Sequence, residues 1–318
     1  MNKIVIGIPT FKRIVLLEKL IKSIYASKLD YNLVCGIDIV VVDNDIEKSA
    51  KPIINKLSTY APKSFKIYYF NEPTKGLSYV RNEILKQAFK FNSKFIVCVD
   101  DDEHVVAEWL IELTKTIIHN KGDFAIGPVL PEFVNQPPLY ISKWFYRKNH
   151  DNNKQLYDFF GGGNLIMKTE FLKKNNLSYD NRFNTTGGED SYFGLEALKK
   201  DAKVFWAKKA LAYETIGNDR ANIYWLFKRA FRGGNTYTYI LIVERMYFLL
   251  LKKIIINIFR ICIGIPLLLL LLFPIKNKYH VLFKFIATSL GSFAAILKIK
   301  FHEYGPLKKS NPKCKNTH

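Results

Sequence analysis

The chain has 318 residues, of which 48% are hydrophobic, 24% are charged and 12 are prolines, a composition that excludes long disordered segments. Its length allows one large α/β domain with an appendage, or two modest domains. The net charge is +20, and residues 244–318 carry +11 of it in the most apolar quarter of the chain, which indicates an anionic membrane surface as the partner and no nucleic acid.

The first 130 residues alternate between strand-like and helix-like patterns. Short apolar runs typical of buried parallel strands occur at residues 3–9, 37–42, 65–70 and 95–99. Two helices are predicted, with inward residues Ile14, Leu17, Ile21 and Ile24 in one and Val80, Ile84, Ala88 and Phe91 in the other. Ser78 is the predicted N-cap of the second helix. This alternation predicts right-handed βαβ units and a parallel sheet.

Polar residues follow each of the four predicted strands. Open α/β sheets bind ligands in the crevice beyond the carboxyl ends of their strands. We therefore expect one site built from residues that are far apart in the sequence, namely Pro9, Thr10, Asp43, Asn71 and Asp100–Asp102.

The alternation fades from residue 131 onward. Three prolines (Pro131, Pro137 and Pro138) and the run Gly161–Gly163 predict loops and short antiparallel strands. Regular patterns return with a helix expected at residues 190–200 and a strand at residues 204–207.

Two apolar segments, residues 254–275 and 281–297, lie near the end of the chain. A spanning helix needs about 20 apolar residues, so the first segment is long enough and the second is marginal. Joined by a short connection, they are expected to form a helical hairpin whose flanking lysines keep both ends in the cytoplasm. Two amphipathic helices lying in the plane of the membrane are the alternative.

The four cysteines, Cys35, Cys98, Cys262 and Cys314, show no CxxC spacing. We expect reduced thiols, and neither a disulfide framework nor a zinc site. The apolar run Ile4–Ile8 is too short for a secretory signal and is cut by Pro9. The expected location is the cytoplasmic face of the inner or plasma membrane.

Asp100, Asp101 and Asp102 come directly after a buried strand. Adjacent carboxylates repel one another, and a hard divalent cation relieves this repulsion. Mg²⁺ and Mn²⁺ take oxygen ligands from one or two carboxylates together with substrate phosphates. Asp100 and Asp102, two positions apart, are therefore the predicted metal ligands, and a solvated acidic turn is the alternative.

Five ordered segments carry a resemblance to a known family. They are IVIGIPTFKR (4–13), IVVVDND (39–45), NEPTKGLSYVRN (71–82), VDDDE (99–103) and GGEDSYF (187–193). Together they resemble family 2 inverting glycosyltransferases of the GT-A fold, over about residues 3–243. The resemblance implies a nucleotide-sugar donor, an Mn²⁺ or Mg²⁺ cofactor, and transfer with inversion to a hydroxyl group.

The resemblance also implies roles for individual residues. Asp100 and Asp102 match the outer members of the DxD metal motif, and Asp190 matches the general base of the ED motif, with Glu189 as its alternate. The residues implied in nucleotide binding are Pro9, Thr10, Asp43, Arg81, Asn82 and Asp101.

Each implied role has a simpler structural alternative. Asp43 also fits a turn cap, Arg81 an ordinary ion pair, and Asp190 an acid that complements a helix dipole. The run Gly161–Gly163 fits a flexible loop as well as a backbone beside the donor sugar, and the pair Arg229 and Arg232 fits a basic helix face as well as phosphate binding. Many family members have a histidine where this chain has Glu214, and whether Glu214 replaces it as a ligand is left open.

We therefore predict a GT-A-like α/β catalytic domain over residues 1–243 and a basic, membrane-associated helical segment over residues 244–318. The expected activity is metal-dependent sugar transfer to a lipid-linked or other glycan acceptor in surface polysaccharide or lipopolysaccharide-type synthesis. Two alternatives are a non-catalytic, membrane-docked scaffold that binds sugar nucleotides, and a nucleotidyltransferase. A scaffold does not need Asp100, Asp102 and Asp190 together, and nucleotidyl transfer predicts a glycine- and lysine-rich loop where this chain has residues 10–13 (TFKR).

Overall fold

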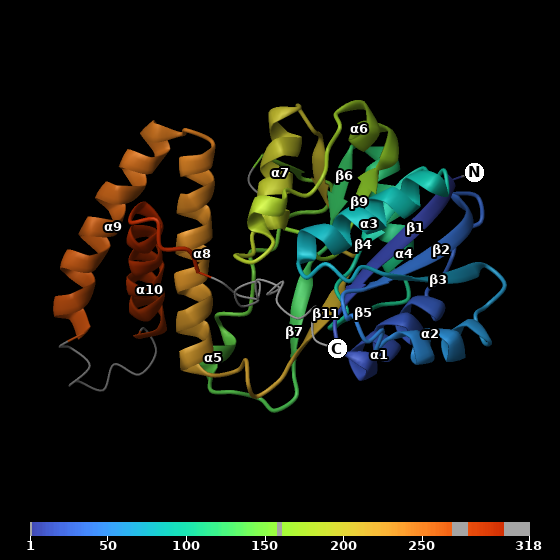
Figure 1. Ribbon diagram of the computed structural model, residues 1–318, viewed down its shortest axis with the longest axis horizontal. Helices are drawn as coiled ribbons and strands as arrows, with labels where there is room; N and C mark the ends of the chain where they lie inside the picture. Colours follow the sequence, from blue (N-terminus) through green and yellow to red (C-terminus); the bar gives the residue numbers. More distant parts are fainter. Residues whose placement is uncertain (1, 158–160, 269–278, 302–318) are drawn as a thin grey trace, which may run out of the picture.

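The computed structural model describes residues 2–157, 161–268 and 279–301 (Figure 1). The strands are β1 Asn2–Thr10, β2 Val34–Asp43, β3 Phe65–Asn71, β4 Phe95–Cys98, β5 Glu103–Val105, β6 Phe124–Ile126, β7 Val129–Phe133, β8 Gln155–Leu156, β9 Leu165–Lys168, β10 Val204–Trp206 and β11 Ala212–Ile216. The helices are α1 Ile14–Tyr25, α2 Lys51–Ser58, α3 Leu77–Lys90, α4 Trp109–His119, α5 Leu139–Ser142, α6 Thr169–Lys174, the 3-10 turn η1 Asn181–Phe183, α7 Glu189–Lys199, α8 Ile223–Val243, α9 Tyr247–Leu268 and α10 Tyr279–Ile296.

The main sheet has eight strands in the order β3-β2-β1-β4-β9-β6-β10-β8. β1 pairs in parallel with β2 and β4, and β2 pairs in parallel with β3. Their register sets Thr10 opposite Asp43, and Asp43 opposite Asn71. The polar residues that follow these strands therefore meet at one edge, as the sequence predicts.

Alternating side chains of the strands pack into two apolar layers. Ile4, Ile6 and Ile8 face the layer formed with α1, α2 and α4, whereas Val5 faces the layer formed with α3, α6 and α7. A strand covered by helices on both faces must be apolar on both, which explains the continuous apolar runs. The α/β prediction is confirmed, including the strands at residues 3–9, 37–42, 65–70 and 95–99.

Short strands from the second half of the chain complete the sheets. β9 runs antiparallel between β4 and β6, and β8 runs antiparallel to β10. β5, β11 and β7 form a separate three-stranded sheet. The prediction of short antiparallel strands in this region is confirmed, but Ser78 is not an N-cap. Gly76 precedes α3, and Ser78 lies inside the first turn, where its hydroxyl donates to the Asp180 carbonyl.

The C-terminal helices pack against α8, which lies between them and the main sheet (Figure 1). A Cβ atom on Gly234 of α8 would collide with the Thr288 carbonyl oxygen, and one on Gly291 of α10 would collide with the Phe231 carbonyl oxygen. Asn235 adds a buried amide that donates to the carbonyls of Gly291 (3.1 Å) and Ile299 (2.8 Å). The two backbones are therefore in direct contact.

The predicted apolar helices at residues 254–275 and 281–297 correspond to α9 and α10, but residues 269–278 lie outside the described part of the chain. Among the described residues, no helix is both long enough and apolar enough to cross a bilayer.

Candidate active site

A cavity of about 650 Å³ opens at the carboxyl ends of β1, β2 and β4. Its wall combines an acidic group, an arginine-rich group and backbone from two glycine segments. The lining residues that matter below are Pro9, Thr10, Arg13, Asn44, Arg81, Asp100, Asp101, Asp102, Glu103, Arg147, Gly162, Gly163, Gly187, Gly188, Glu189, Asp190, Glu214, Arg220, Trp225, Arg229 and Arg232.

The three aspartates after β4 lie in different surroundings. The Asp101 side chain is 7% exposed, accepts from the Thr10 hydroxyl (2.9 Å) and pairs with Arg13 (3.0 Å). Asp102 pairs with Arg13 and Arg220, both at 2.9 Å. Asp100, at 35% exposure, is the most accessible of the three side chains. Asp100 is therefore the most open of the three to the cavity, whereas Asp101 and Asp102 are held by arginines at its wall.

Arg81, from α3, connects the two halves of the site. Its buried guanidinium pairs with Asp100 Oδ1 at 3.0 Å and lies 3.4 Å from Glu189 Oε1. It also donates to the Gly162 carbonyl, and the Gly162 amide donates to Asp190 Oδ2 at 3.0 Å. Hydrogen bonds through Arg81 and Gly162 therefore connect the segment after β4 with the first turn of α7.

Glu189 and Asp190 begin α7 directly after Gly188. Gly188 has φ +91° and lies so close to Thr236 of α8 that a Cβ atom would collide with the Thr236 methyl group. Glu189 is buried at 3% exposure, and Asp190 is partly exposed at the cavity wall. Of the two side chains, Asp190 is the more exposed at the cavity wall.

The three-stranded sheet brings Glu214 into the site. β11 pairs antiparallel with β5, which places Glu214 opposite Glu103 and joins the Thr215 amide to the Asp102 carbonyl. Glu214 forms an ion pair with Arg220. Burial raises its pKa, but the charges of Arg220 and Arg229 more than offset this, so the pKa of Glu214 is lowered.

The acidic group offers carboxylate oxygens of the kind that bind a divalent cation. The carboxylates of Asp100, Asp101, Asp102, Glu103 and Glu214 lie together at the cavity, and Arg13, Arg81 and Arg220 form ion pairs with four of them. Burial raises the pKa of Asp101 to about 6, and burial with neighbouring carboxylates raises the pKa of Glu103 well above its usual range. Glu103 Oε2 is buried and has no hydrogen-bond partner in the part of the chain that the structure describes.

Within the described residues there is no ready-made cluster of three or more His, Cys, Asp or Glu side chains arranged to hold a metal. Asp100 and Asp102, the two predicted metal ligands, both line the cavity.

Two of the predicted nucleotide-binding residues do not line this cavity. Asp43 is fully buried and accepts from the amides of Asp45 and Ala50 and from the Tyr69 hydroxyl. Asn82 exchanges two 2.8 Å hydrogen bonds with the backbone of Tyr179. The carboxylate of Asp43 and the amide of Asn82 therefore hold loops in place, and the neighbouring Asn44 reaches the cavity instead. Pro9, Thr10, Arg81 and Asp101 are at the wall as expected.

Sequence reasoning missed Arg13, Asn44, Glu103 and Arg147, all of which line the cavity. Arg13 was detectable as the first arginine after a strand that ends in Pro-Thr. The others reach the site through loops and through the pairing of β5 with β11, and no sequence spacing indicates that pairing.

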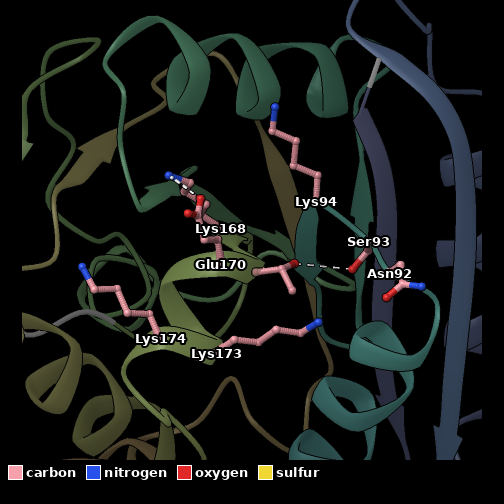
Figure 2. Close-up of a pocket in the computed structure, with 8 residues that line it drawn as sticks. Asn92, Ser93, Lys94, Lys168, Glu170, Lys173 and Lys174 are labelled. Carbon is pink, nitrogen blue, oxygen red and sulfur yellow. Dashed lines mark hydrogen bonds and ion pairs between the residues drawn. The ribbon is translucent and has the colours of Figure 1, made fainter.

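A second hollow, of about 440 Å³, lies at the opposite edge of the sheet, where β4 begins and β9 ends (Figure 2). It is lined by Lys94, Lys168, Lys173 and Lys174, with Glu170 paired to Lys168 at 3.1 Å. In Figure 2 the ammonium groups of Lys94, Lys173 and Lys174 point in different directions, so they do not converge on a common ligand.

Comparison with known proteins agrees with this architecture. The sequence model of the family described as Glycosyl transferase family 2 matches residues 5–175, more than half of the chain. The succinoglycan biosynthesis protein ExoM of Rhizobium meliloti (strain 1021) is 26% identical over 239 residues, which cover 73% of each chain.

Solved structures show the same fold at low sequence identity. Residues 1–349 of S. aureus TarS superpose with a TM-score of 0.52 and 19% identity, over 72% of this chain and 65% of TarS 1–349. GalNAc-T7, solved with UDP, GalNAc and Mn²⁺, superposes with a TM-score of 0.54 and 13% identity, over 73% of this chain and 51% of its own. This chain thus spans less than two thirds of either structure. The predicted GT-A-like arrangement is confirmed by these superpositions.

Proposed function

Because the chain belongs to glycosyl transferase family 2 and is therefore a glycosyltransferase, we propose that it moves a sugar from a nucleotide-sugar donor to a hydroxyl of a lipid-linked glycan, with inversion. Relatives support the substrate classes. TarS was solved with UDP and with UDP-GlcNAc, and ExoM is named for succinoglycan biosynthesis. The product would be a surface polysaccharide or a precursor of one.

The observation that carries this proposal is the link between Asp100 and Asp190 through Arg81 and Gly162. A nucleotide diphosphate bound near Asp100 and an acceptor hydroxyl near Asp190 would then meet inside one cavity. Asp190 takes the proton of the hydroxyl as it attacks the anomeric carbon, and the bond to the diphosphate breaks on the other side. One displacement of this kind inverts the configuration.

We also propose that Asp100 and Asp102 hold Mn²⁺ or Mg²⁺. When bound, such an ion supplies positive charge where the diphosphate leaving group gains negative charge. Arg81 stays in contact with Asp100 and fixes the direction of its carboxylate. Arg13 and Arg220 share Asp102 in this structure and would keep that carboxylate in place at the edge of the cavity.

We further propose that the protein lies on the cytoplasmic face of the membrane, with α9 in contact with the lipid surface. The support is the exposed apolar side of this helix, where Phe248, Ile255 and Phe259 are 80%, 59% and 66% exposed. No acidic residue occurs between Arg245 and His302, so this surface is attracted to anionic lipids.

The test of the proposed function is Asp190→Asn in the full chain. The amide keeps the size of the side chain but cannot take a proton, so transfer should fall by about 10²–10⁴. Transfer of radiolabelled sugar from a panel of nucleotide sugars to extracted lipid-linked acceptors measures the effect. Donor affinity should barely change, because the proposed donor contacts lie at Asp100 and Asp102.

Two further variants make the result interpretable. Asp201→Asn, in the exposed turn after α7, removes a carboxylate outside the cavity and should leave transfer intact. Glu189→Gln should cost less than Asp190→Asn. Full activity of Asp190→Asn with loss in Glu189→Gln would move the base by one residue, and unimpaired transfer in both would refute the mechanism.

A further inference from the structure

The wall of the cavity formed by α8 carries an arginine group that lies apart from the proposed metal ligands. Arg229 and Arg232 project from α8, and Arg147 comes from the segment after α5. The carboxylates proposed to bind the metal and the donor come instead from the segment after β4. The two groups share one cavity but belong to different elements.

One member of the arginine group, Arg229, packs on an aromatic side chain that also contacts Arg220. The guanidinium groups of Arg220 and Arg229 lie 5.1 Å and 5.0 Å from the centre of the Trp225 ring. Trp225 stacks on Phe145, with ring centres 5.7 Å apart and an interplanar angle of 9°. Asn222 caps α8 by accepting from the Trp225 amide at 2.9 Å. These contacts lower the cost of ordering the Arg229 guanidinium for a ligand.

Positive charge is concentrated in this group. Arg220 forms ion pairs with Asp102 and Glu214. Glu214 is also the carboxylate whose charge acts on Arg229. Burial lowers the pKa of Arg229 to about 10; Glu214 opposes this, and Arg232, Arg147 and Arg220 lower the pKa further. A bound anion would relieve the mutual repulsion of these arginines.

The arginine group also lies close to the proposed base. Arg232 Nη1 is 3.8 Å from the position that a Cβ atom on Gly187 would take, three residues before Asp190. Close packing of Thr236 on Gly188 fixes α8 against the same loop. An anion held by Arg232 would therefore be near the reacting hydroxyl, not at the far end of a long glycan.

We propose that Arg147, Arg229 and Arg232 form a second anion subsite, which binds the phosphate or diphosphate of an acceptor whose phosphorylated sugar also carries the reacting hydroxyl. This rests on the proposed function, because it names the acceptor class for the same cavity. Guanidinium forks match phosphate oxygens in pairs, and helix α8 lies next to α9 and α10, toward which a lipid chain would extend (Figure 1). The donor diphosphate is the other possible source of the anion.

The test is a binding experiment with two ligands on the full chain. The first is farnesyl diphosphate, and the second is whichever of UDP, dTDP, GDP and ADP binds the wild type best in the presence of Mn²⁺. The double variant Arg229→Gln/Arg232→Gln should bind farnesyl diphosphate weaker by about tenfold or more, since each charged hydrogen bond contributes about that much. Its nucleotide affinity should change less than about twofold.

Asp100→Asn should have the opposite effect to the double variant: it should weaken Mn²⁺-dependent nucleotide binding and leave farnesyl diphosphate binding unchanged. Lys228→Gln is the matched control, because Lys228 is an exposed cation of α8 outside the cavity, and it should affect neither ligand. Equal losses for both ligands in the double variant would assign the arginines to the donor and overturn the proposal. The proposal would also be overturned if the double variant bound farnesyl diphosphate as well as the wild type does, or if the wild type did not bind it.

Because binding is measured without turnover, this result is separable from the proposed reaction. Selective loss of farnesyl diphosphate binding supports the subsite even if no tested sugar is transferred. Transfer to extracted lipid-linked, phosphorylated acceptors at the same rate in the wild type and the double variant would support the reaction and refute the subsite.

Discussion

The buried pair formed by Arg81 and Glu189 shows how residue-level geometry sets charge in this site. Among the described residues Arg81 Nε makes no hydrogen bond and lies 3.4 Å from Glu189 Oε1, whereas Arg81 Nη2 bonds to Asp100 at 3.0 Å. The attraction of Arg81 therefore does not compensate Glu189 for its loss of water. Burial and the charge of Asp190 raise the pKa of Glu189 to about 7, from an ordinary value of 4.5.

This pKa predicts a pH dependence of stability. Between pH 4.5 and about 7 the folded chain keeps a proton on Glu189 that the unfolded chain releases, so the free energy of unfolding falls as the pH rises. Glu189→Gln should remove this part of the fall, on the order of 3 kcal/mol between pH 5 and pH 8. Urea denaturation of both proteins at the two pH values measures it.

The control for this measurement is Glu196→Gln, on the same helix, which lacks the burial of Glu189 and pairs with Lys199 at 2.9 Å. Its stability should follow the wild type across the pH range. An identical loss of stability between pH 5 and pH 8 in the wild type and Glu189→Gln would show that Glu189 does not titrate in this window.

At the scale of elements, the sequence predicts what local pattern determines. β1 to β4 follow from apolar runs, and the convergence of Thr10, Asp43 and Asp100 follows from parallel register. β5, β7 and β11 are three to five residues long and form only because they pair with one another, so no periodicity reveals them. The placement of Glu214 and Arg220 beside Asp102 depends on that pairing, and it could not be predicted.

Asp43 and Asn82 illustrate a different limit. A family motif predicts position in the chain, and both residues lie in the expected elements, Asp43 at the end of β2 and Asn82 within α3. Whether the side chain points to the cavity or bonds to a loop depends on the local backbone. Here Asp43 satisfies the amides of Asp45 and Ala50, and Asn82 bonds to Tyr179.

The contact of α8 with α10 predicts opposite effects for neighbouring glycines. Replacing glycine by alanine inside a helix normally stabilises it by about 1 kcal/mol, and Gly233→Ala should do so, because its Cβ atom would meet nothing within 4 Å. Gly234→Ala should instead destabilise the protein by about 1–3 kcal/mol, because the new methyl group meets the Thr288 carbonyl. Urea denaturation of the two variants measures the difference, and equal stabilisation by both would contradict the packing of these helices.

At the scale of the whole molecule, α8 belongs to two parts at once. One side carries Arg229 and Arg232 at the cavity, and another carries Gly234 and Asn235 against α10. The predicted boundary between residues 243 and 244 coincides with the end of α8, but removing residues 244–318 would expose the side that α10 covers. A test of membrane binding is therefore better made in the full chain than by truncation.

The exposed apolar side of α9 predicts binding to anionic membranes. Phe248, Ile255 and Phe259 are spaced so that they share one side of the helix, while Asn257 faces inward and bonds to Ser289. The full chain should sediment with vesicles that contain phosphatidylglycerol. The triple variant Phe248→Gln/Ile255→Gln/Phe259→Gln should bind these vesicles at least about tenfold more weakly, since each buried side chain contributes about 1.5–3 kcal/mol.

Two controls distinguish this interaction from non-specific hydrophobic binding. Ile46→Gln and Tyr60→Gln remove apolar side chains that are 75% and 56% exposed on the main-sheet part of the protein, and this double variant should bind vesicles as the wild type does. Added salt should weaken vesicle binding by the wild type, because it screens the attraction between anionic lipids and the Lys/Arg residues within and beside α9. If the α9 variant and the wild type sediment equally, α9 does not bind the bilayer. If both proteins also resist extraction with carbonate, residues 244–318 bind the membrane without the exposed side of α9, and the proposed orientation of α9 is wrong.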